Sequence, residues 1–555
     1  LLKTGGSIFT FNSGTGNSGN IFLDIRDNIT FDGKVISDKF PIQSNARTSV
    51  NNGDAGNIHI NTGSLFLTNG SSIDTNGFAE ENSNEIANAG NITINARDSI
   101  KFDGEFSGLY TSLHRVKGKG GDIQITTGSL SLSNSATLYA VTSGQGDAGD
   151  IRINASDTVT FDNNSFASSS VFREAIGNGG DIEITAGSLS IGDASSLATL
   201  TLGQGDAGNV TINSNTFEAV NGGQINTQTS TSGNAGNINL NIKDKIKLSG
   251  TGQAQTSGLF ATALTESTGK GGSIFIDPRL VIIENGAGVS VASLGSGDAG
   301  DISLQADNLR LNNGFIAAIT NSTQGGNINL QLGELLLLRK NSQISTTAGF
   351  AQAGGNGGNI MINSPFIVAV PKENSDITAN AFSGNGGNID ITSQGIFGIT
   401  PRSQVTPQSD ITASSETGIQ GTINITNPEI DPNQGVIELP EGFVDKSNQI
   451  AQVCPQGVNA KRLSEFYITG RGSLPPSPFK PLTGYINRTS LATLDEDTSR
   501  QEDKVIRSDR KIDSQSKEIV EAQGFMKNAD GDIYLVAQVP SSILSSNAVN
   551  SACSS

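Results

Sequence analysis

Near-copies of one short stretch recur along most of this chain, and one of them reads Gly146-Asp147-Ala148-Gly149-Asp150-Ile151-Arg152-Ile153-Asn154. In most copies a Gly is followed by Asn, Asp or Ser, and then by apolar residues on alternate positions. This order is typical of a tight turn that leads into a short β-strand. No constellation of catalytic residues accompanies the repeat, so it informs first about architecture.

The turn glycines are spaced like the corners of a solenoid. From Gly6 to Gly421 there are 14 intervals over 415 residues, about 30 residues each, which falls in the range of solenoid repeats. The intervals run from 13 residues (Gly6 to Gly19) to 37 (Gly19 to Gly56), and the variation falls in polar stretches such as 79–88, as expected of corner loops. The aligned glycines are Gly6, Gly19, Gly56, Gly90, Gly121, Gly149, Gly180, Gly208, Gly236, Gly272, Gly300, Gly326, Gly358, Gly387 and Gly421.

Each repeat contains three short segments in which apolar and polar residues alternate. In the repeat that begins at Gly121, two such segments flank a Thr-Gly-Ser corner at 127–129, and a third follows at 137–142. Three strands per repeat, without helical periodicity, predict an all-β fold: a single-stranded right-handed parallel β-helix of about 14 to 15 coils over residues 1–427. With neighbouring strands about 4.8 Å apart, such a rod is roughly 70 Å long.

Two kinds of coil alternate in the first half of the chain. Coils with Thr-Gly-Ser-Leu or Ala-Gly-Ser-Leu interleave with coils that end in Phe-Asp-Gly or Phe-Asp-Asn, so the repeating unit is two coils, about 60 residues. The residue after the corner glycine also recurs, and it is most often Asn. Asn side chains stacked at this position predict a ladder of amide hydrogen bonds along the axis. Adjacent Asp carboxylates would fit such a stack less well than neutral Asn. The expected ladder comprises Asn20, Asn57, Asn91, Asn209, Asn237, Asn327, Asn359 and Asn388, with Asp122, Asp150, Asp181 and Asp301 interspersed.

Composition and charge agree with a narrow β-coil and disfavour two classes of partner. Gly makes up 68 of 555 residues, Trp is absent and 5% of residues are aromatic, whereas a globular core of this size would contain more large rings. The net charge of -18 would repel nucleic acid and anionic membrane surfaces. The longest apolar runs, such as 335–338, are far shorter than the roughly 20 residues that span a bilayer, so we expect a soluble chain without a transmembrane segment.

The repeat pattern ends after Gly421, and the sequence predicts two further regions. Residues 428–494 form a Pro-rich irregular region, and residues 495–555 form a charged linker followed by a small β segment with a strand at 533–537. The only cysteines, Cys454 and Cys553, lie in these regions. They pair in a disulfide or remain two unrelated thiols, and the spacing leaves both open.

Gly-rich turns with Asp raise the hypothesis of a calcium site. The run at 118–125, Gly-Lys-Gly-Gly-Asp-Ile-Gln-Ile, resembles the calcium-binding nonapeptide of β-rolls. That nonapeptide needs tandem copies every nine residues so that facing turns share each ion, whereas this chain has one turn per coil and mostly Asn. The sequence therefore favours structural turns over metal binding.

Three other groups of residues are candidates for chemistry, and each has a plainer interpretation. Asp32, Asp103 and Asp162 would form the best acidic set for a polysaccharide lyase or hydrolase, but each follows an apolar strand in ordinary turn chemistry. The two histidines, His59 and His114, lie in different repeats without a carboxylate cluster nearby. The repeats contain only two tyrosines, Tyr110 and Tyr139, so a deep aromatic sugar groove is not supported, although weak contacts along Ser, Thr and Asn rows remain open.

The repeats and the tail together resemble a known family. Gly-Asp-Ala-Gly-Asn-Ile-x-Ile with Gly-Ser-Leu-x-Leu and Phe-Asp-Gly, and the motifs Thr-Gly-Arg-Gly-Ser-Leu-Pro-Pro at 469–476 and Glu-Ala-Gln-Gly-Phe at 521–525, resemble the filamentous-haemagglutinin-like exoproteins of two-partner secretion, particularly the cyanobacterial members. The resemblance covers nearly the whole chain. It implies a right-handed β-helix that a partner outer-membrane transporter secretes to the cell surface, with no catalytic, cofactor-binding or metal residues to carry over.

One feature of that family is missing from this sequence. The amino-terminal secretion domain, with its Asn-Pro-Asn-Gly type motif, is not found, and the chain enters the repeats immediately after Leu1. We therefore expect a carboxy-terminal portion of such a protein or a shortened gene product.

These observations predict a secreted or surface-displayed β-helical adhesin or structural exoprotein, without enzymatic activity, whose ligands are carbohydrate or protein of the cell surface or extracellular matrix. The alternative is a β-helix enzyme that acts on extracellular polysaccharide. It would require several convergent acidic or basic side chains on one face of the coil. A calcium-dependent β-roll is the third hypothesis, and it predicts that a chelator lowers the melting temperature.

Overall fold

A computed structural model describes residues 1–3, 6–12, 16–35, 41–42, 45–50, 53–78, 86–252, 255–321, 323–349, 354–427, 524–527 and 533–536. The chain divides into two units, Leu1–Pro440 and Glu441–Ser555. The predicted regions 428–494 and 495–555, with Cys454 and Cys553, lie outside the described residues except for two short strands.

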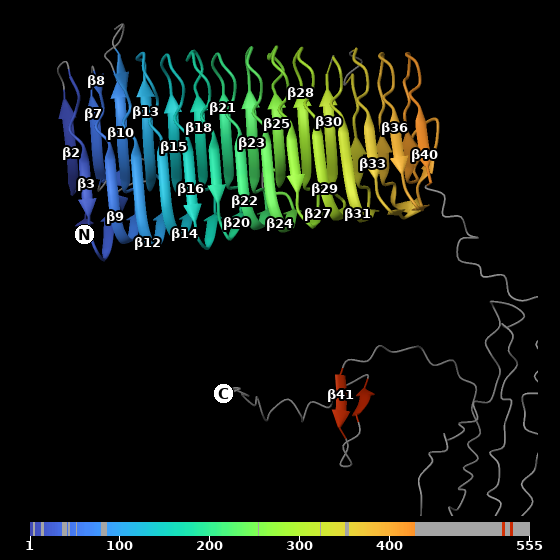
Figure 1. Cartoon of the computed structure of the whole chain (residues 1–555), viewed down its shortest axis with the longest axis horizontal. Helices are drawn as coiled ribbons and strands as arrows, with labels where there is room; N and C mark the ends of the chain where they lie inside the picture. The colour runs from blue at the N-terminus through green and yellow to red at the C-terminus, as the bar shows by residue number, and fades with distance from the viewer. Residues whose placement is uncertain are drawn as a thin grey trace, which may run out of the picture. The chain divides into compact units, whose positions relative to one another are not determined.

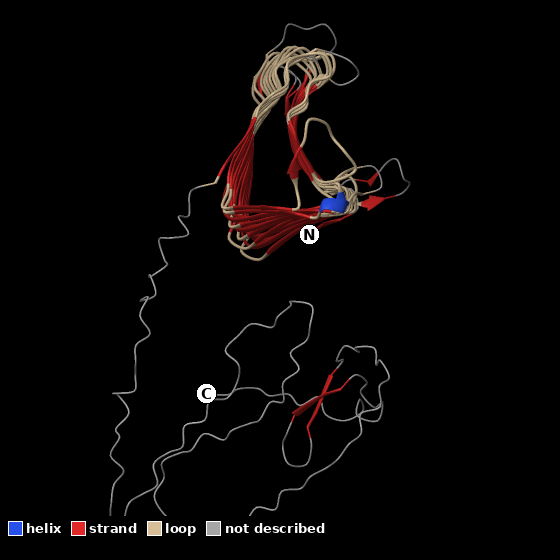
Figure 2. Ribbon diagram, turned by 90° about the vertical axis from the view of Figure 1, so that its right-hand side faces the viewer, coloured by secondary structure: helices blue, strands red, loops and turns tan. Residues whose placement is uncertain are grey.

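The first unit is a β-solenoid whose strands stack as parallel rungs, from β2 at one end to β40 at the other (Figure 1). Viewed along the stack, each coil is a triangle with three strand faces joined by corners (Figure 2). The all-β parallel solenoid predicted from the sequence is confirmed. Among the described residues the only helical element is a single 3-10 turn at Pro371–Glu373.

The first face follows the glycine corner, and in several coils its strand runs on around a bend into the second face. These strands are β3 (Ile21–Asp24), β9 (Ile58–Thr68), β12 (Ile92–Asp103), β14 (Ile123–Ser133), β16 (Ile151–Ala155), β19 (Ile182–Thr185), β22 (Val210–Val220), β24 (Ile238–Ser249), β26 (Ile274–Asp277), β29 (Ile302–Asn312), β31 (Ile328–Arg339), β33 (Ile360–Asn363), β36 (Ile389–Thr392) and β40 (Ile423–Thr426). Fourteen first-face strands bound 13 complete turns, close to the 14 to 15 coils predicted.

The second face has separate strands wherever the bend interrupts pairing. They are β1 (Leu2–Lys3), β4 (Asn28–Asp32), β17 (Thr158–Phe161), β20 (Ser188–Ile191), β27 (Leu280–Glu284), β34 (Phe366–Ala369) and β37 (Gly395–Phe397).

The third face forms its own sheet. Its strands are β2 (Ser7–Asn12), β7 (Asn45–Val50), β10 (Ser72–Phe78), β13 (Gly108–His114), β15 (Thr137–Thr142), β18 (Phe166–Val171), β21 (Ser196–Thr201), β23 (Gln224–Thr229), β25 (Gly258–Ala263), β28 (Gly288–Ser293), β30 (Phe315–Thr320), β32 (Gln343–Ser345), β35 (Asp376–Thr378), β39 (Asp410–Thr412) and β38 (Thr400–Pro401). The three strands per coil predicted from the sequence are thus confirmed, including the strand at 137–142.

Two pairs of short strands lie outside the three faces. These are β5 (Lys34–Val35) with β6 (Pro41–Ile42), and β8 (Gly53–Asp54) with β11 (Ala87–Asn88). In the second unit β41 (Gly524–Lys527) pairs antiparallel with β42 (Ile533–Val536), which agrees with the strand predicted at 533–537.

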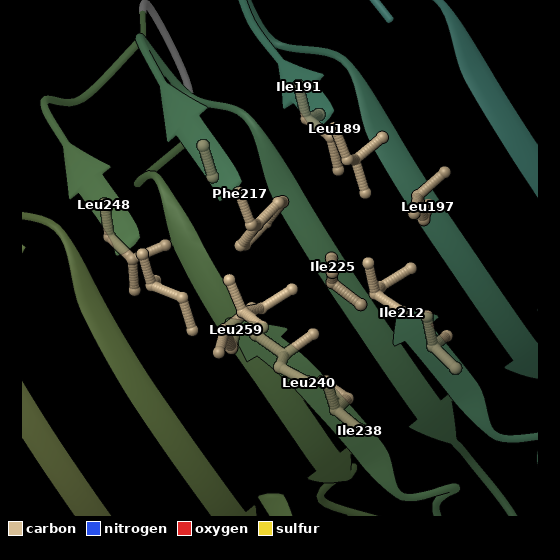
Figure 3. Packing of buried hydrophobic residues seen from close by; sticks show 14 of the residues in the cluster. Leu189, Ile191, Leu197, Ile212, Phe217, Ile225, Ile238, Leu240, Leu248 and Leu259 are labelled. Atoms are coloured by element: carbon tan, nitrogen blue, oxygen red, sulfur yellow. The ribbon is translucent and has the colours of Figure 1, made fainter. Parts of the chain in front are cut away.

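The interior is one continuous apolar column because alternate residues of all three faces point inward. In one coil Ile212, Phe217 and Ile225 contribute from the first, second and third face, and each is fully buried. Figure 3 shows these side chains with the equivalent residues of neighbouring coils. Most of these buried side chains are Ile, Leu, Val and Ala, and the buried rings are Phe31, Phe102, Phe161 and Phe217, which agrees with the low aromatic content.

One of the predicted corner glycines does not belong to the corner. Gly6 precedes the third-face strand β2, and a Cβ there would meet Leu2 of its own segment. The first corner glycine is Gly19, so the 13-residue interval from Gly6 to Gly19 is not a coil. The remaining intervals are whole coils.

Candidate functional site

The recurring corner is held by direct backbone stacking. At Gly208 an added Cβ would lie 2.0 Å from the carbonyl oxygen of Gly180, and at Gly236 it would lie 1.8 Å from that of Gly208. The same relation links every corner glycine from Gly56 to Gly421 to its predecessor. A second column lies three residues earlier and includes Gly146, where φ is +148° and the distance to the Gly118 oxygen would be 1.6 Å. These glycines are required for close approach of the coils.

The residue after the corner glycine forms a ladder, but the predicted amide-to-amide bonding is wrong. The side-chain oxygen of each residue accepts the backbone N–H of its counterpart in the next coil, as in Asn237 N–H to Asn209 Oδ1 at 2.9 Å. An oxygen acceptor is all that the position needs, so Asp serves as well as Asn. Asp122, Asp150 and Asp181 accordingly follow one another, with N–H to Oδ1 distances of 2.9 and 2.8 Å.

Buried hydroxyls on the third face also hold the glycine corner, and sequence reasoning missed them. Thr199 Oγ1 donates to the carbonyl oxygen of Gly208 at 2.5 Å, and Thr227 Oγ1 donates to that of Gly236 at 2.5 Å. Both threonines are fully buried. The available signal was a Thr or Ser in a strand position whose alternation predicts an inward side chain.

The three aspartates of the Phe-Asp motif are not brought together. The register places Thr68 between Asp32 and Asp103, and Ser133 between Asp103 and Asp162, so neighbouring members lie two rungs apart. Two of them hold the loop of the next coil: Asp32 accepts from Thr68 Oγ1 at 3.1 Å and Asn69 Nδ2 at 2.8 Å, and Asp103 accepts from Ser133 Oγ and Asn134 Nδ2.

Hydrogen bonds to the Asp103 carboxylate lower its pKa. Partial burial alone would raise its pKa, but hydrogen bonds from Asn134, Lys101 and Ser133 together lower it. The Asp of one coil and the Asn of the next therefore form one unit. The same contact joins Asp193 to Asn221, so it is not confined to the Phe-Asp coils.

The two histidines lie apart, whereas the two tyrosines of the repeats are neighbours. His59 lies on the first face near Phe22, whereas His114 ends a third-face strand, where burial and then Arg115 lower its pKa. Tyr110 and Tyr139 are neighbours on the outside of the third face, with ring centroids 6.3 Å apart, and burial raises the pKa of both. Because their rings meet edge to face, they do not form a flat stacking platform.

The calcium hypothesis depends on the carboxylate of Asp122, and that group already has a partner. Its Oδ1 accepts the N–H of Asp150, and Lys119 lies three residues before it in the same turn. In the part of the chain that the structure describes, no group of three or more His, Cys, Asp and Glu side chains is arranged to hold a metal ion.

A pair of acidic residues near the end of the solenoid, Asp376 and Asp410, was not predicted from the sequence. Asp376 and Asp410 lie side by side on β35 and β39, and the N–H of Asp410 donates to Asp376 Oδ1 at 3.0 Å. Asp410 forms an ion pair with Arg402, which belongs to the C-terminal strap, the loop 402–408 between β38 and β39. Burial raises the pKa of Asp376 to about 6. The signal was an identical Ser-Asp-Ile-Thr-Ala at 375–379 and 409–413.

This acidic pair is the closest approach to the convergent charges that a polysaccharide enzyme requires. Asp376 is 3% exposed and Asp410 is 0% exposed, and the C-terminal strap supplies the only cation described beside them. A substrate could not reach either carboxylate while the strap is in place. The geometry therefore fits a closing device for the last coils.

An open groove runs along the bend between the first and second faces. It has a volume of about 930 Å³ and is formed by the last outward residue of each first-face strand together with the residues of the bend. The outward residues, here named the carboxamide row, are Thr185, Asn213, Asn241, Asp277, Gln305, Gln331 and Asn363. A smaller hollow of about 200 Å³ continues the row through Thr126 and Asn154.

Amide-to-amide hydrogen bonds do occur in this solenoid, along the carboxamide row. Asn241 Nδ2 donates to Asn213 Oδ1 at 2.8 Å, and Asn363 Nδ2 donates to Gln331 Oε1 at 3.3 Å. The same strand position holds a bonded pair outside the groove, Asn95 Nδ2 to Asn61 Oδ1 at 3.0 Å. These amide pairs lie four positions after the place where the sequence predicted an amide ladder.

Comparison of the chain with known proteins found no matching family model, no matching curated protein and no matching solved structure. In the described ranges no helix is long and apolar enough to cross a membrane.

Proposed function

We propose that this chain is a secreted or surface-displayed β-helical adhesin or structural exoprotein without enzymatic activity, which a partner outer-membrane transporter exports. The observation that supports it most is the unbroken glycine corner, repeated from Gly19 to Gly421. A catalytic site needs one set of unique residues, whereas this chain repeats the same contacts in every coil. The result is an extended surface on which outward side chains recur at a fixed spacing.

The resemblance of the repeats and tail to haemagglutinin-like exoproteins supplies the cellular setting of the proposal. The net charge of -18 supports it further, because a strongly acidic rod does not adhere to nucleic acid or to anionic lipid. Cell-surface or matrix carbohydrate and protein remain the ligand classes that such a rod would meet.

Fractionation of the cells that express the protein tests this proposal. An antibody to the repeats is expected to detect the protein in the medium or the outer-membrane fraction, with a cytoplasmic enzyme as the marker for lysis. Retention in the cytoplasmic fraction would overturn the proposal.

A further inference from the structure

We propose that the groove along the carboxamide row binds an extended, uncharged polysaccharide that lies parallel to the solenoid axis. The inference deepens the proposed function and rests on it for its biological setting.

The shape of the groove selects a long and narrow ligand. Its lining runs from Thr185 on the strand β19 to Asn363 on β33, which are six rungs apart. At about 4.8 Å per rung the groove is roughly 29 Å long. The continuation through Thr126 and Asn154 lies on the same row, so the ligand site follows the axis of the rod.

The chemistry of the lining matches a chain of hydroxyl groups. Each Asn or Gln carboxamide offers two N–H donors and an acceptor oxygen, and the bond from Asn241 to Asn213 uses one donor and one lone pair. The amide residues of the row, Asn213, Asn241, Gln305, Gln331 and Asn363, are all at least partly exposed, so a ligand can reach them. A sugar hydroxyl both donates and accepts, so successive sugars along the groove can pair with successive rungs.

The charges of the groove balance and so favour a neutral ligand. Lys243 and Arg279 line it together with Asp277 and Asp307, and Arg279 Nε lies 4.0 Å from Asp244 Oδ1. The formal charge of the lining is zero. Because the whole chain carries a charge of -18, an anionic polymer would be repelled on approach.

An extended peptide is the other linear ligand to consider, and the groove fits it less well. Peptides add to sheets through an open strand edge. The strands beneath the groove, β22 to β31, are paired on both sides. The apolar side chains that line the groove, Ile242, Ala306 and Leu332, are buried and so offer little apolar surface to the side chains of a peptide.

The expected affinity per sugar is low, because none of the residues that line the groove is aromatic. Binding should instead rise with ligand length as more rungs are engaged, in the manner of a multivalent contact. A long polysaccharide is therefore the appropriate probe, and short oligosaccharides should compete poorly.

Affinity electrophoresis of the full chain tests the proposal in native gels that contain hydroxyethyl cellulose, mannan, dextran, heparin or denatured casein. We expect at least one neutral polysaccharide to retard the protein. The double variant Asn213→Thr/Asn241→Thr should raise the apparent Kd at least about fivefold, since each lost hydrogen bond is worth about 1 kcal/mol. Threonine already occupies this strand position at Thr185, so the variant is expected to fold.

The matched control is the double variant Asn61→Thr/Asn95→Thr, which removes the same type of pair outside the groove. It should be retarded like the wild type. The proposal is overturned if no neutral polysaccharide retards the protein, if both double variants lose retardation equally, or if only heparin or casein binds. Localisation of the protein distinguishes failure of this proposal from failure of the proposed function. If the protein is at the cell surface but no glycan retards it, only the groove ligand is contradicted. If it is cytoplasmic but binds glycan, only the exoprotein function is contradicted.

Discussion

The glycine corner leaves no room for a side chain, and this has a measurable consequence at Gly208. An alanine Cβ there would lie 2.0 Å from the Gly180 oxygen and 2.5 Å from its carbonyl carbon. The coils must separate locally, so we expect Gly208→Ala to destabilise the solenoid by at least ~3 kcal/mol. Thermal melting of the full chain measures the effect.

The control for that variant is Gly354→Ala. The nearest atom to a Cβ at Gly354 is Ser383 Oγ at 3.7 Å, an ordinary contact. This variant should melt within about 2 °C of the wild type, since surface changes are usually within 0.5 kcal/mol. Equal melting of Gly208→Ala and Gly354→Ala would contradict the stacking explanation.

The buried hydroxyl of Thr199 gives a second prediction at this scale. Thr199→Val keeps the shape but removes the donor to the Gly208 carbonyl, which leaves a buried oxygen without that bond and should cost about 1–3 kcal/mol. Thr199→Ser keeps the hydroxyl and should lose less. Chemical denaturation followed by circular dichroism distinguishes the two, and an unchanged Thr199→Val would show that the bond is dispensable.

The sequence predicted which residues stack at the corner but not the atoms that bond. Alignment of Asn209 with Asn237 follows from the repeat alone. Whether Oδ1 meets an amide side chain or a backbone N–H depends on the few-ångström offset between coils, which periodicity does not encode. The presence of Asp150 and Asp181 at the same position was the clue that a backbone donor is used.

At the scale of elements, the C-terminal strap closes over two stacked carboxylates of β35 and β39. Burial raises the pKa of Asp376 to about 6 in the folded chain, against about 3.9 for an unperturbed aspartate. Because the folded pKa is raised, this group favours the fold when protonated, and its contribution is lost as the pH rises from about 4 through 6.

Asp376→Asn tests this sign. The amide keeps the acceptor oxygen for Asp410 N–H but removes the buried charge, so the variant should be more stable than the wild type at pH 7.5 by about 1–2 kcal/mol. The difference should shrink toward pH 4.5. Melting temperatures at both pH values measure it, and a variant that is less stable at pH 7.5 would show that the carboxylate is needed ionised.

Arg402→Ala concerns the same element and is expected to act in the opposite direction. It leaves the fully buried Asp410 without its cation, although Thr406 N–H still donates to that carboxylate. A loss of about 2–4 kcal/mol is expected at pH 7.5. Limited proteolysis should then cut within 402–408, and resistance equal to the wild type would contradict a closing role for the strap.

The strands were easier to predict from the sequence than the contacts between residues of different coils. Alternation of apolar residues sufficed for strands such as β15, because one face of every strand is buried. The acidic pair escaped because Asp376 and Asp410 lie 34 residues apart and meet only through the register of two coils. The groove escaped for a similar reason: it depends on how the bend after Asn241 is shaped relative to its neighbours.

At the scale of the whole molecule, stability is a sum over coils that contact only their neighbours. Deletion of residues 181–208 removes one coil of 28 residues and joins Gly180 to Asn209, whose N–H can then meet Asp150 Oδ1. The shortened chain should fold, with a melting temperature within ~5 °C of the wild type. Deletion of half a coil, 181–194, places third-face residues in first-face positions and should prevent folding. Circular dichroism and gel filtration check both, and the two deletions behaving alike would contradict a modular solenoid.

One corner, repeated in every coil, holds the solenoid together along its whole length. Hydrogen exchange of the full chain, read by mass spectrometry, tests this at the backbone amides of Asn209, Asn237 and Asn327. Each amide donates to the side chain of the preceding coil at 2.7 to 2.9 Å, so all three should exchange as slowly as the strand amides of the interior. Rapid exchange at these corners beside protected strands would contradict the claim, because the corner would then be a loop that merely connects the faces.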